Sequence, residues 1–358
     1  MFIETMGQTT GTTNYAFDPT WLRLWGKTPG HEDSHEYRRG RYHPLLFHIL
    51  DVAAVTGLIW DHCLNGDTRD RIARSLGGNT RQQIMFWSGA HDLGKASPHF
   101  QKQIPELAVD LGLPFSDNDR PCRHGFITAH EVSAIVGSSP ASNVLGQVTG
   151  GHHGVFPRSE DLHMGQDTLG RKPWDATRRR LLEEFATTIA FDWSQSFDTI
   201  REIADPAMIP ILAGLVSVAD WIGSNQEYFP CFAKHGTRTR GTPADYWTQT
   251  QVTARRALES LGWIPEVVFV KEEPFETLYP GFLPNAMQRA VIEVASKQSA
   301  PYLMIVEAPM GQGKTEAALY SADVAMCRRF ARGMYVAMPT QATSNAMFER
   351  VLNGCLGR

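Results

Sequence analysis

The adjacent pair His91-Asp92, inside the run AHDLGK, is the feature of this sequence with the most chemical content. Imidazoles and carboxylates together suit divalent transition metals, and a carboxylate can bridge two ions where an imidazole cannot. Residues of both types lie on either side of the pair, enough to hold two ions with positions left open for water and substrate. We therefore predict metal-assisted hydrolysis of a phosphate ester. The candidate ligands are His48, His91, Asp92, His124, His152, His153 and Asp220.

The sequence around these candidates has the periodicity of helices. A helix is predicted to begin at His43-Pro44, because proline suits a first helical turn, and to continue through 45–64 with His48 on its inward face. Asp220 lies near the end of an apolar run, where a carboxylate is costly to bury without a cation or strong hydrogen bonds. Further helices are predicted over 81–92, 124–137, 143–152, 174–190 and 207–223.

Each candidate also has an ordinary structural interpretation. His48 can be a satisfied core histidine, the doublet His152-His153 can simply end a helix, and Asp220 can cap a helix or pair with an arginine. The remaining histidines lie mostly in polar stretches or at helix ends, and we interpret most of them as surface residues. These are His31, His35, His43, His62, His99, His163 and His235.

Two further residues have candidate roles beside the ligands. Lys95 follows Asp92 by three residues, so it either meets a substrate phosphate as a point charge or is a solvated lysine at a helix end. Ser217 precedes Asp220 by three residues on the same helical face. It either orients that carboxylate or bonds to the backbone of its own helix.

The order of the candidates, together with their neighbours, resembles the HD-domain phosphohydrolases. The segments RHGFITA around His124, GGHHG around the doublet and LVSVADWIGS around Asp220 are similar to one branch, the nuclease domain of the CRISPR-associated helicase–nucleases of type I systems. The resemblance covers roughly residues 20–260. It implies a helical HD bundle.

The same resemblance implies how the ligands divide between two ions, with Asp92 shared. The carboxylate of Asp92 has two oxygens with which to bridge. Histidine-rich ligation favours Fe, Ni, Co, Mn or Zn over Mg, which prefers oxygen donors. The first ion would be held by His48, His91, Asp92 and Asp220, and the second by Asp92, His124, His152 and His153.

The composition and hydrophobic pattern of the sequence change beyond about residue 263. Prolines and charges over 263–281 indicate a linker. Then follow an apolar run at 302–309, the loop GQGKT at 311–315, a helical stretch to about 330, a second apolar run at 333–339 and a last helical stretch. Strand, loop, helix, strand, helix is the beginning of a parallel α/β domain.

The loop at 308–315 (APMGQGKT) is a candidate phosphate-binding loop. Backbone N–H groups near Gly311 and Gly313 would face phosphate oxygens, Lys314 would reach the β and γ groups, and Thr315 would hold Mg²⁺. The usual first glycine is replaced by alanine, as in superfamily 2 helicases, which this segment resembles. That resemblance implies that Gln288 of GFLPNAMQ reads adenine and that PTQATSNAMFERV (339–351) contacts DNA.

Parts that an ATPase requires are not found after this loop in the given sequence. No acidic Asp-Glu-x-His box follows, and no second lobe supplies arginine fingers. We expect this polypeptide neither to hydrolyse ATP efficiently nor to unwind DNA. ATP and Mg are expected as cofactors of the helicase segment only in a full-length form.

Composition is that of a soluble globular protein. The 358 residues are 42% hydrophobic and 20% charged with a net charge of −4, which gives no global basic signature, so any nucleic-acid contact must come from local patches. The five cysteines form no C-x-x-C and indicate reduced thiols in the cytoplasm. We find no signal peptide and no apolar run near the ~20 residues that cross a bilayer, and we predict no membrane partner.

We therefore predict a mostly α fold, an HD-domain helical bundle followed by the truncated beginning of a RecA-like parallel α/β lobe. The predicted boundaries are 1–262 for the nuclease domain, 263–281 for the linker and 282–358 for the incomplete helicase domain.

The resemblance implies the function: a metal-dependent nuclease for single-stranded DNA in CRISPR antiviral defence, with a guide-RNA surveillance complex as partner. DNA contacts are expected from local basic clusters. The alternatives are an HD-type nucleotide phosphohydrolase and a non-catalytic fragment that docks on the surveillance complex. The basic clusters are Arg38, Arg39 and Arg41, and Arg178, Arg179 and Arg180.

Overall fold

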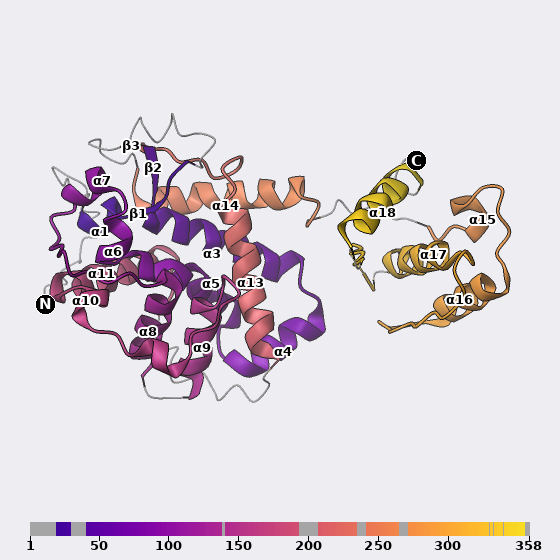
Figure 1. The fold of residues 1–358 in the computed structure, drawn as a ribbon, viewed down its shortest axis with the longest axis horizontal. Helices are drawn as coiled ribbons and strands as arrows, with labels where there is room; N and C mark the ends of the chain where they lie inside the picture. Colours follow the sequence, from indigo (N-terminus) through magenta and orange to yellow (C-terminus); the bar gives the residue numbers. More distant parts are fainter. Residues whose placement is uncertain are drawn as a thin grey trace, which may run out of the picture. The chain divides into compact units, whose positions relative to one another are not determined.

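The computed structural model describes residues 19–29, 41–137, 140–192, 207–234, 241–264, 271–328, 330–331, 333–338 and 340–354. The chain divides into two compact units, Met1–Pro265 and Glu266–Arg358 (Figure 1). Arg38 and Arg39 of the first predicted basic cluster lie outside the described residues.

The first unit is built around helix α3 (Leu45–His62). Every residue from Leu45 to Gly57 is buried, because the helix is apolar on nearly all sides and other helices surround it. It packs against α5 (Thr80–Gly89), α13 (Met208–Gly223) and α14 (Pro243–Ser260) (Figure 1).

Helix α3 is also long and apolar enough to cross a membrane by composition, with a mean hydropathy of 1.3 over 18 residues. The expectation that no such run exists was therefore wrong. Within the protein 78% of this window is buried, as is usual for a core helix.

A second group of helices covers another side of α5 and carries further candidate ligands. Helices α8 (His124–Val136) and α9 (Pro140–Gly150) pack against each other, and α8 also packs against the 3-10 helix η2 (Ala90–Lys95). The other elements among the described residues of this unit are α1 (Thr20–Arg23), α4 (Gly66–Leu76), α6 (Pro98–Gln101), α7 (Pro105–Val109), η3 (Ser159–Leu162), α10 (Gln166–Leu169) and α11 (Lys172–Thr188).

A small antiparallel sheet lies beside the start of α3. Its order is β1 (Trp25–Lys27), β2 (Arg41–Pro44) and β3 (Ala233–Lys234). Lys27 is opposite His43 in the register of the first pair. A Cβ on Gly26 would lie 3.0 Å from the Leu45 Cα, so β1 runs directly against α3.

Most predicted helices are present, with shifted ends. The helix predicted over 81–92 ends at Gly89, and the chain then tightens into η2, which holds His91 and Asp92. Helix α14 was not predicted, although Thr242 and Asp245 form a capping box with Pro243 in its first turn. His43, interpreted as a surface residue, is wholly buried in β2.

The second unit contains α15 (Phe275–Leu278), α16 (Ala286–Lys297), α17 (Lys314–Cys327) and α18 (Gln341–Gly354). Its small core is formed by Phe275, Ala295, Tyr320 and Val324. The two helices predicted after the apolar runs are present as α17 and α18.

The two strands predicted in this unit are not formed. In the described residues of 302–309 and 333–338 the backbone pairs with no neighbouring strand, and the Leu303 and Ile305 side chains are 89% and 78% exposed. Short apolar runs suit strands, but a strand acquires its hydrogen bonds only from a partner, and two strands alone are marginally stable. The described part of this unit therefore lacks the parallel sheet of the predicted RecA-like lobe.

Candidate metal centre

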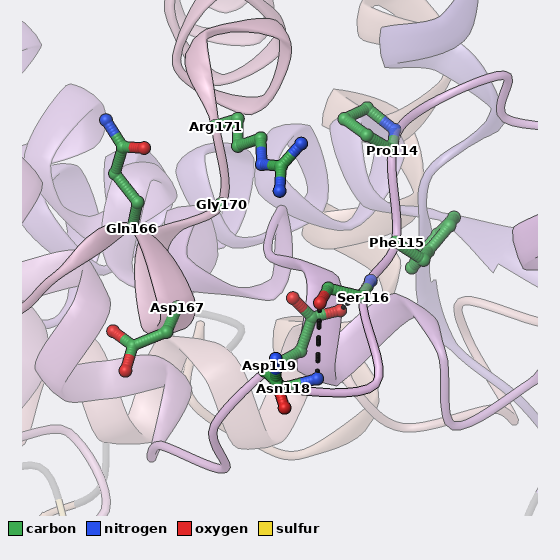
Figure 2. Close-up of a pocket in the computed structure, with 9 residues that line it drawn as sticks. All are labelled: Pro114, Phe115, Ser116, Asn118, Asp119, Gln166, Asp167, Gly170 and Arg171. Carbon is green, nitrogen blue, oxygen red and sulfur yellow. Dashed lines mark hydrogen bonds between the residues drawn. The ribbon is translucent and has the colours of Figure 1, made fainter.

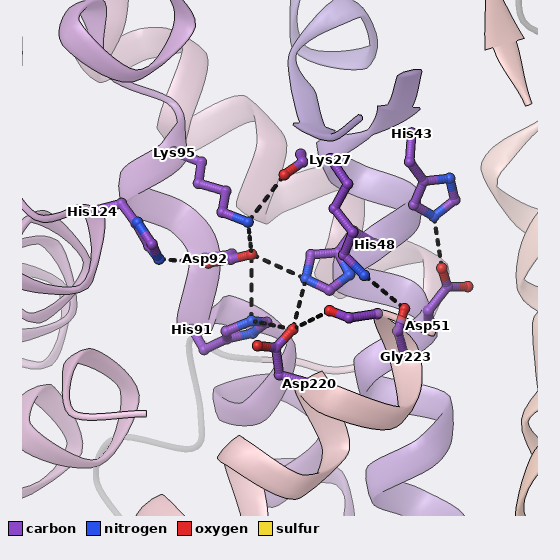
Figure 3. A network of polar contacts seen from close by, with 12 residues as sticks. Lys27, His43, His48, Asp51, His91, Asp92, Lys95, His124, Asp220 and Gly223 are labelled. Atoms are coloured by element: carbon purple, nitrogen blue, oxygen red, sulfur yellow. Dashed lines mark hydrogen bonds and ion pairs between the residues drawn. The ribbon is translucent and has the colours of Figure 1, made fainter. Parts of the chain in front are cut away.

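The seven predicted ligands come together from five places in the first unit. His48 lies on α3, His91 and Asp92 on η2, His124 at the start of α8, and Asp220 in the last turn of α13 (Figure 3). His152 and His153 lie in the turn after α9. Their donor atoms fall into two groups, each with atoms within 4.8 Å of one another, that can hold a metal ion.

The first group contains His48, His91, Asp92 and Asp220. The His48 Nε2 lies 3.0 Å from Asp92 Oδ2 and 3.2 Å from Asp220 Oδ1. The corresponding distances from His91 Nε2 are 3.4 Å and 3.5 Å. Two imidazoles thus face the same two carboxylate oxygens.

The second group contains His124, His152 and His153. The other carboxylate oxygen of Asp92, Oδ1, lies 3.2 Å from His124 Nε2 and 3.8 Å from His152 Nε2. His153 Nε2 lies 3.0 Å from His124 Nε2. Asp92 therefore stands between the groups, with one oxygen toward each.

Backbone carbonyls orient two of these imidazoles. The His91 ring nitrogen Nδ1 lies 2.7 Å from the Ser88 carbonyl oxygen, and the His152 Nδ1 lies 2.6 Å from that of Thr149. A carbonyl accepts only, so each Nδ1 carries a proton and each Nε2 faces the cluster, where it can bind a metal whenever it carries no proton of its own.

The donor set fits a metal. In the described part of the chain, the Nε2 atoms of His48, His91 and His152 are buried and complete no hydrogen bond. The polar atoms that they face are carboxylate oxygens of Asp92 and Asp220, and an ionised carboxylate has no proton to donate to an imidazole lone pair. Imidazole lone pairs converging on carboxylates are the arrangement that a divalent transition metal requires.

Charges inside the cluster favour ionised carboxylates. Burial raises the pKa of Asp92, but the charges of His91 and Lys95 outweigh it and hold this pKa well below its usual range. Burial likewise raises the pKa of Asp220, and contacts with His48 and His91 reverse the shift to a strong lowering.

The histidines shift in different directions. Burial and the charge of His91 lower the pKa of His152 to about 3, and burial and the charge of Lys27 lower the pKa of His48. Burial lowers the pKa of His91 as well, but the charges of Asp92 and Asp220 raise it to about 10. Without metal, His91 therefore carries the proton that balances two carboxylates, and metal binding must displace it.

Close backbone contacts hold the elements together at the cluster. A Cβ on Gly125 would lie 2.4 Å from the Gly150 carbonyl oxygen, and a Cβ on Gly150 would lie 2.5 Å from that of Gly125. The backbones of α8 and α9 are therefore in contact next to the ligands that these segments carry. Thr128 accepts a hydrogen bond from the Gly94 N–H and donates one to the His91 carbonyl. This side chain locks η2 onto α8.

The two accessory predictions have different outcomes. The Lys95 Nζ lies 2.7 Å from Asp92 Oδ2 and donates to the Gly26 carbonyl, so its side chain points into the cluster (Figure 3). Ser217 does not orient Asp220. It donates to the carbonyls of His152 and Ala213, while Ser224 donates to Asp220 Oδ1 at 2.8 Å.

Two residues near the cluster were not predicted. Lys27 donates from Nζ to the Gly223 carbonyl at 2.8 Å, and burial lowers its pKa to about 8. Asp51, one turn after His48 and fully buried, pairs with His43 at 2.7 Å and accepts from Tyr246 and Thr250 of α14. The capping box of α14 was the one local signal that pointed to this network.

The basic cluster at Arg178–Arg180 is not a uniform surface patch. Arg178 is 1% exposed, contacts Glu131 and Asp175, and donates to the Ala96 and Leu169 carbonyls. An arginine with so many partners inside the fold is a structural residue, and only its two neighbours are exposed.

The predicted phosphate-binding loop lies in the second unit. Gly311 and Gly313 have φ of 75° and 73°, and Lys314 donates to the Ala308 and Pro309 carbonyls. Thr315 lies half-buried in the first turn of α17. The Gln288 side chain accepts from the Asn285 N–H in the capping box of α16 and donates to the Gly313 carbonyl, so it contacts the loop itself.

A separate cavity of about 220 Å³ lies between the segments 114–119 and 166–171 (Figure 2). It is polar and shares no residue with the metal cluster. Its lining residues are Pro114, Phe115, Ser116, Asn118, Asp119, Gln166, Asp167, Gly170 and Arg171.

The family profile and the relatives that match this chain point to the same family. The sequence profile described as "Cas3, HD domain" matches residues 25–229. The CRISPR-associated endonuclease/helicase Cas3 of Thermus thermophilus is 34% identical over 344 residues, which is 92% of this chain and 35% of that protein.

Solved structures agree with the sequence match. A crystal structure of a CRISPR-associated protein, 34% identical, has a TM-score of 0.74 and covers 93% of this chain and 37% of its own. The T. fusca Cas3–AMPPNP crystal structure, 26% identical, has a TM-score of 0.68 over 96% of this chain and 38% of its own. The chain thus spans little more than a third of the length of these relatives.

Proposed function

The chain belongs to the Cas3 HD-domain family, and on that basis we propose that it is a metal-dependent nuclease that cuts single-stranded DNA in CRISPR antiviral defence. The observation that carries the proposal is the position of Asp92. Its Oδ2 lies 3.0 Å from His48 Nε2 and its Oδ1 lies 3.2 Å from His124 Nε2. One carboxylate between two imidazole groups is the arrangement that bridges two ions.

His48, His91, Asp92 and Asp220 would hold one ion, and Asp92, His124, His152 and His153 the other. Bound together, two such ions activate water and neutralise charge on a phosphodiester. The ligand histidines favour Fe, Ni, Co, Mn or Zn, and disfavour Mg.

The chain's own groups prepare the site for an anionic substrate. Asp92 is 1% exposed, so water is largely excluded around it, whereas the exposed His153 leaves that side of the cluster open to substrate. Lys95 holds a positive charge 2.7 Å from Asp92 Oδ2, where it can turn toward a phosphate oxygen. A single strand reaches such a recessed cluster more easily than a duplex.

The second unit is proposed to be the beginning of a RecA-like helicase lobe that binds nucleotide. The domain boundaries would follow the predicted ones, at 1–262, 263–281 and 282–358. Relatives that cover this region are named as helicases, and one was crystallised with AMPPNP. In a full-length form, Gln288, Gly311, Gly313, Lys314 and Thr315 would bind ATP and Mg.

The proposed partner is a guide-RNA surveillance complex of a type I CRISPR system, and the proposed location is the cytoplasm. Both rest on the family to which the chain belongs.

The test is a nuclease assay of the full chain on circular single-stranded DNA with Mn²⁺, Co²⁺, Ni²⁺, Fe²⁺, Zn²⁺ and Mg²⁺ compared. We expect cutting with the transition metals and its loss in Asp92→Ala. Asp61→Ala, which removes an acid that pairs with Arg81 at the surface, is the matched control and should cut normally. Cutting that survives Asp92→Ala would place the activity elsewhere. Hydrolysis of nucleotides without cutting of DNA would favour a phosphohydrolase.

A further inference from the structure

Strand β1 touches both of the segments that supply carboxylates to the metal cluster. The Lys27 Nζ donates to the carbonyl of Gly223 at 2.8 Å, and Gly223 is the last residue of α13, three residues after Asp220. On the other side, Lys95 donates to the Gly26 carbonyl at 3.0 Å while it pairs with Asp92 (Figure 3).

The hydrogen bond from Lys27 gives the C-terminal end of α13 a donor for one of its carbonyls. The last carbonyls of a helix have no partner within it, and a positive charge at this end is favourable. Helix α13 has no basic residue in its own last turn. Lys27, 196 residues earlier in the chain, therefore supplies both the donor and the charge.

The strand itself is held firmly. A Cβ on Gly26 would lie 3.0 Å from the Leu45 Cα and 3.5 Å from the His48 Cβ, so β1 runs against the turn of α3 that carries His48. Lys27 also pairs in register with His43 of β2. A lysine anchored this way can fix the end of α13 relative to α3.

We propose that Lys27 is a positioning residue of the metal centre: by holding the Gly223 carbonyl it fixes the last turn of α13 so that Asp220 faces His48 and His91. The inference rests on the proposed metal-dependent function. Asp220 is the one predicted ligand on α13, and its Oδ1 lies 3.2 Å from His48 Nε2. Release of this helix end therefore costs the first ion one of its two carboxylates.

The experiment compares Lys27→Met with Lys27→Arg in the full chain. Methionine keeps the apolar stem and removes the donor and the charge, whereas arginine keeps both. Lys102→Met is the matched control, because Lys102 also donates to a backbone carbonyl, that of Ser116, and contacts none of the predicted ligands. Binding of Co²⁺ to metal-free protein is measured by calorimetry and by the absorption spectrum of the bound ion.

We expect Lys27→Met to bind the first Co²⁺ about 10- to 100-fold more weakly, as is usual when a partner that orients a ligand is lost. Its spectrum should change, and its kcat on circular single-stranded DNA should fall. Its KM should stay within about twofold, because the Lys27 ammonium is engaged by the Gly223 carbonyl of the protein itself. Lys27→Arg should recover most of the affinity, and Lys102→Met should match the wild type. If Lys27→Met does not fold, Lys27→Gln replaces it in the same comparison.

Three results would overturn the inference. They are wild-type Co²⁺ affinity in folded Lys27→Met, a rise in KM at unchanged kcat, and an arginine variant as weak as the methionine variant. In each of these cases the wild type still binds Co²⁺ and cuts DNA, so the proposed function stands. A wild type that binds no Co²⁺ would defeat the proposed function and, with it, the inference.

Discussion

The backbone of Gly94 lies so close to His124 that a Cβ on Gly94 would come within 1.9 Å of the His124 carbonyl oxygen. Gly94 follows Asp92 by two residues, and His124 begins α8. This contact sets the separation between the bridging carboxylate and the second group of histidines.

Gly94→Ala should therefore destabilise the fold by about 3 kcal/mol or more, because neither backbone can yield without moving a whole element. Urea unfolding measures the change. Gly66→Ala is the control, since a Cβ there meets no atom within 4 Å, and it should stay within about 1 kcal/mol of the wild type. Equal stabilities for the two variants would show that η2 and α8 are not locked together.

The network around Asp51 predicts a large loss of stability on truncation. Asp51→Ala leaves His43, Tyr246 and Thr250 without their common acceptor inside the protein. We expect a loss of about 3–5 kcal/mol in the free energy of unfolding. Asp61→Ala breaks only a partly exposed pair with Arg81, and it should cost less than about 1 kcal/mol. A small effect of Asp51→Ala would mean that α14 is not tied to α3 through this carboxylate.

Ser217 should matter for the second ion. Ser217→Ala removes the hydroxyl that donates to the His152 carbonyl, and we expect about tenfold weaker binding of that ion. Calorimetric titration of Co²⁺ gives both affinities. Ser75→Ala also removes a hydroxyl that bonds to its own helix, at the Arg71 carbonyl on α4, and serves as the control. Unchanged affinity in Ser217→Ala would limit the role of this residue to its own helix.

The buried lysine predicts a pH dependence of stability. Burial lowers the pKa of Lys27 from 10.5 to about 8, so between these values the unfolded chain holds a proton that the folded chain has released. Stability rises with pH where the unfolded state binds more protons. In metal-free protein, the unfolding free energy of the wild type relative to Lys27→Met should therefore rise from pH 8 to 10.5. The rise should be at most about 3–4 kcal/mol, from about 1.4 kcal/mol per pKa unit.

Unfolding of both proteins in urea at several pH values in this range gives the difference directly. The raised pKa of His91 acts in the opposite direction, with stability lost as the pH rises through about 10. His91 is present in the wild type and in Lys27→Met, so its effect cancels in the difference between their unfolding free energies. A difference that falls with pH would contradict the assignment of a depressed pKa to Lys27.

The seven ligands were predicted from two local signals and from the resemblance of the segments around His124 and Asp220 to HD nuclease domains. Adjacent His91-Asp92 and the doublet His152-His153 pair donors with nothing between them. The sequence did not show which serine bonds the Asp220 carboxylate, because that depends on how the helices pack. Ser217 and Ser224 lie three residues before and four after Asp220, on the same helical face, and only the structure shows that the second one bonds the carboxylate.

Features that depend on distant partners were not predictable in this way. Lys27 lies on a three-residue strand far from α13 in the sequence, so no periodicity connects it with Gly223. The apolar run over 302–309 was predicted to be a strand, yet a strand forms only beside another. The tightening of the chain into η2 after Gly89 likewise follows from its contact with α8.

The most direct test of the account is the anomalous scattering of a crystal of the full chain grown with Mn²⁺. We predict two peaks roughly 3.5–4 Å apart, with Asp92 between them, one beside His48, His91 and Asp220 and the other beside the histidines at 124, 152 and 153. A single peak, or peaks that do not share Asp92, would contradict it.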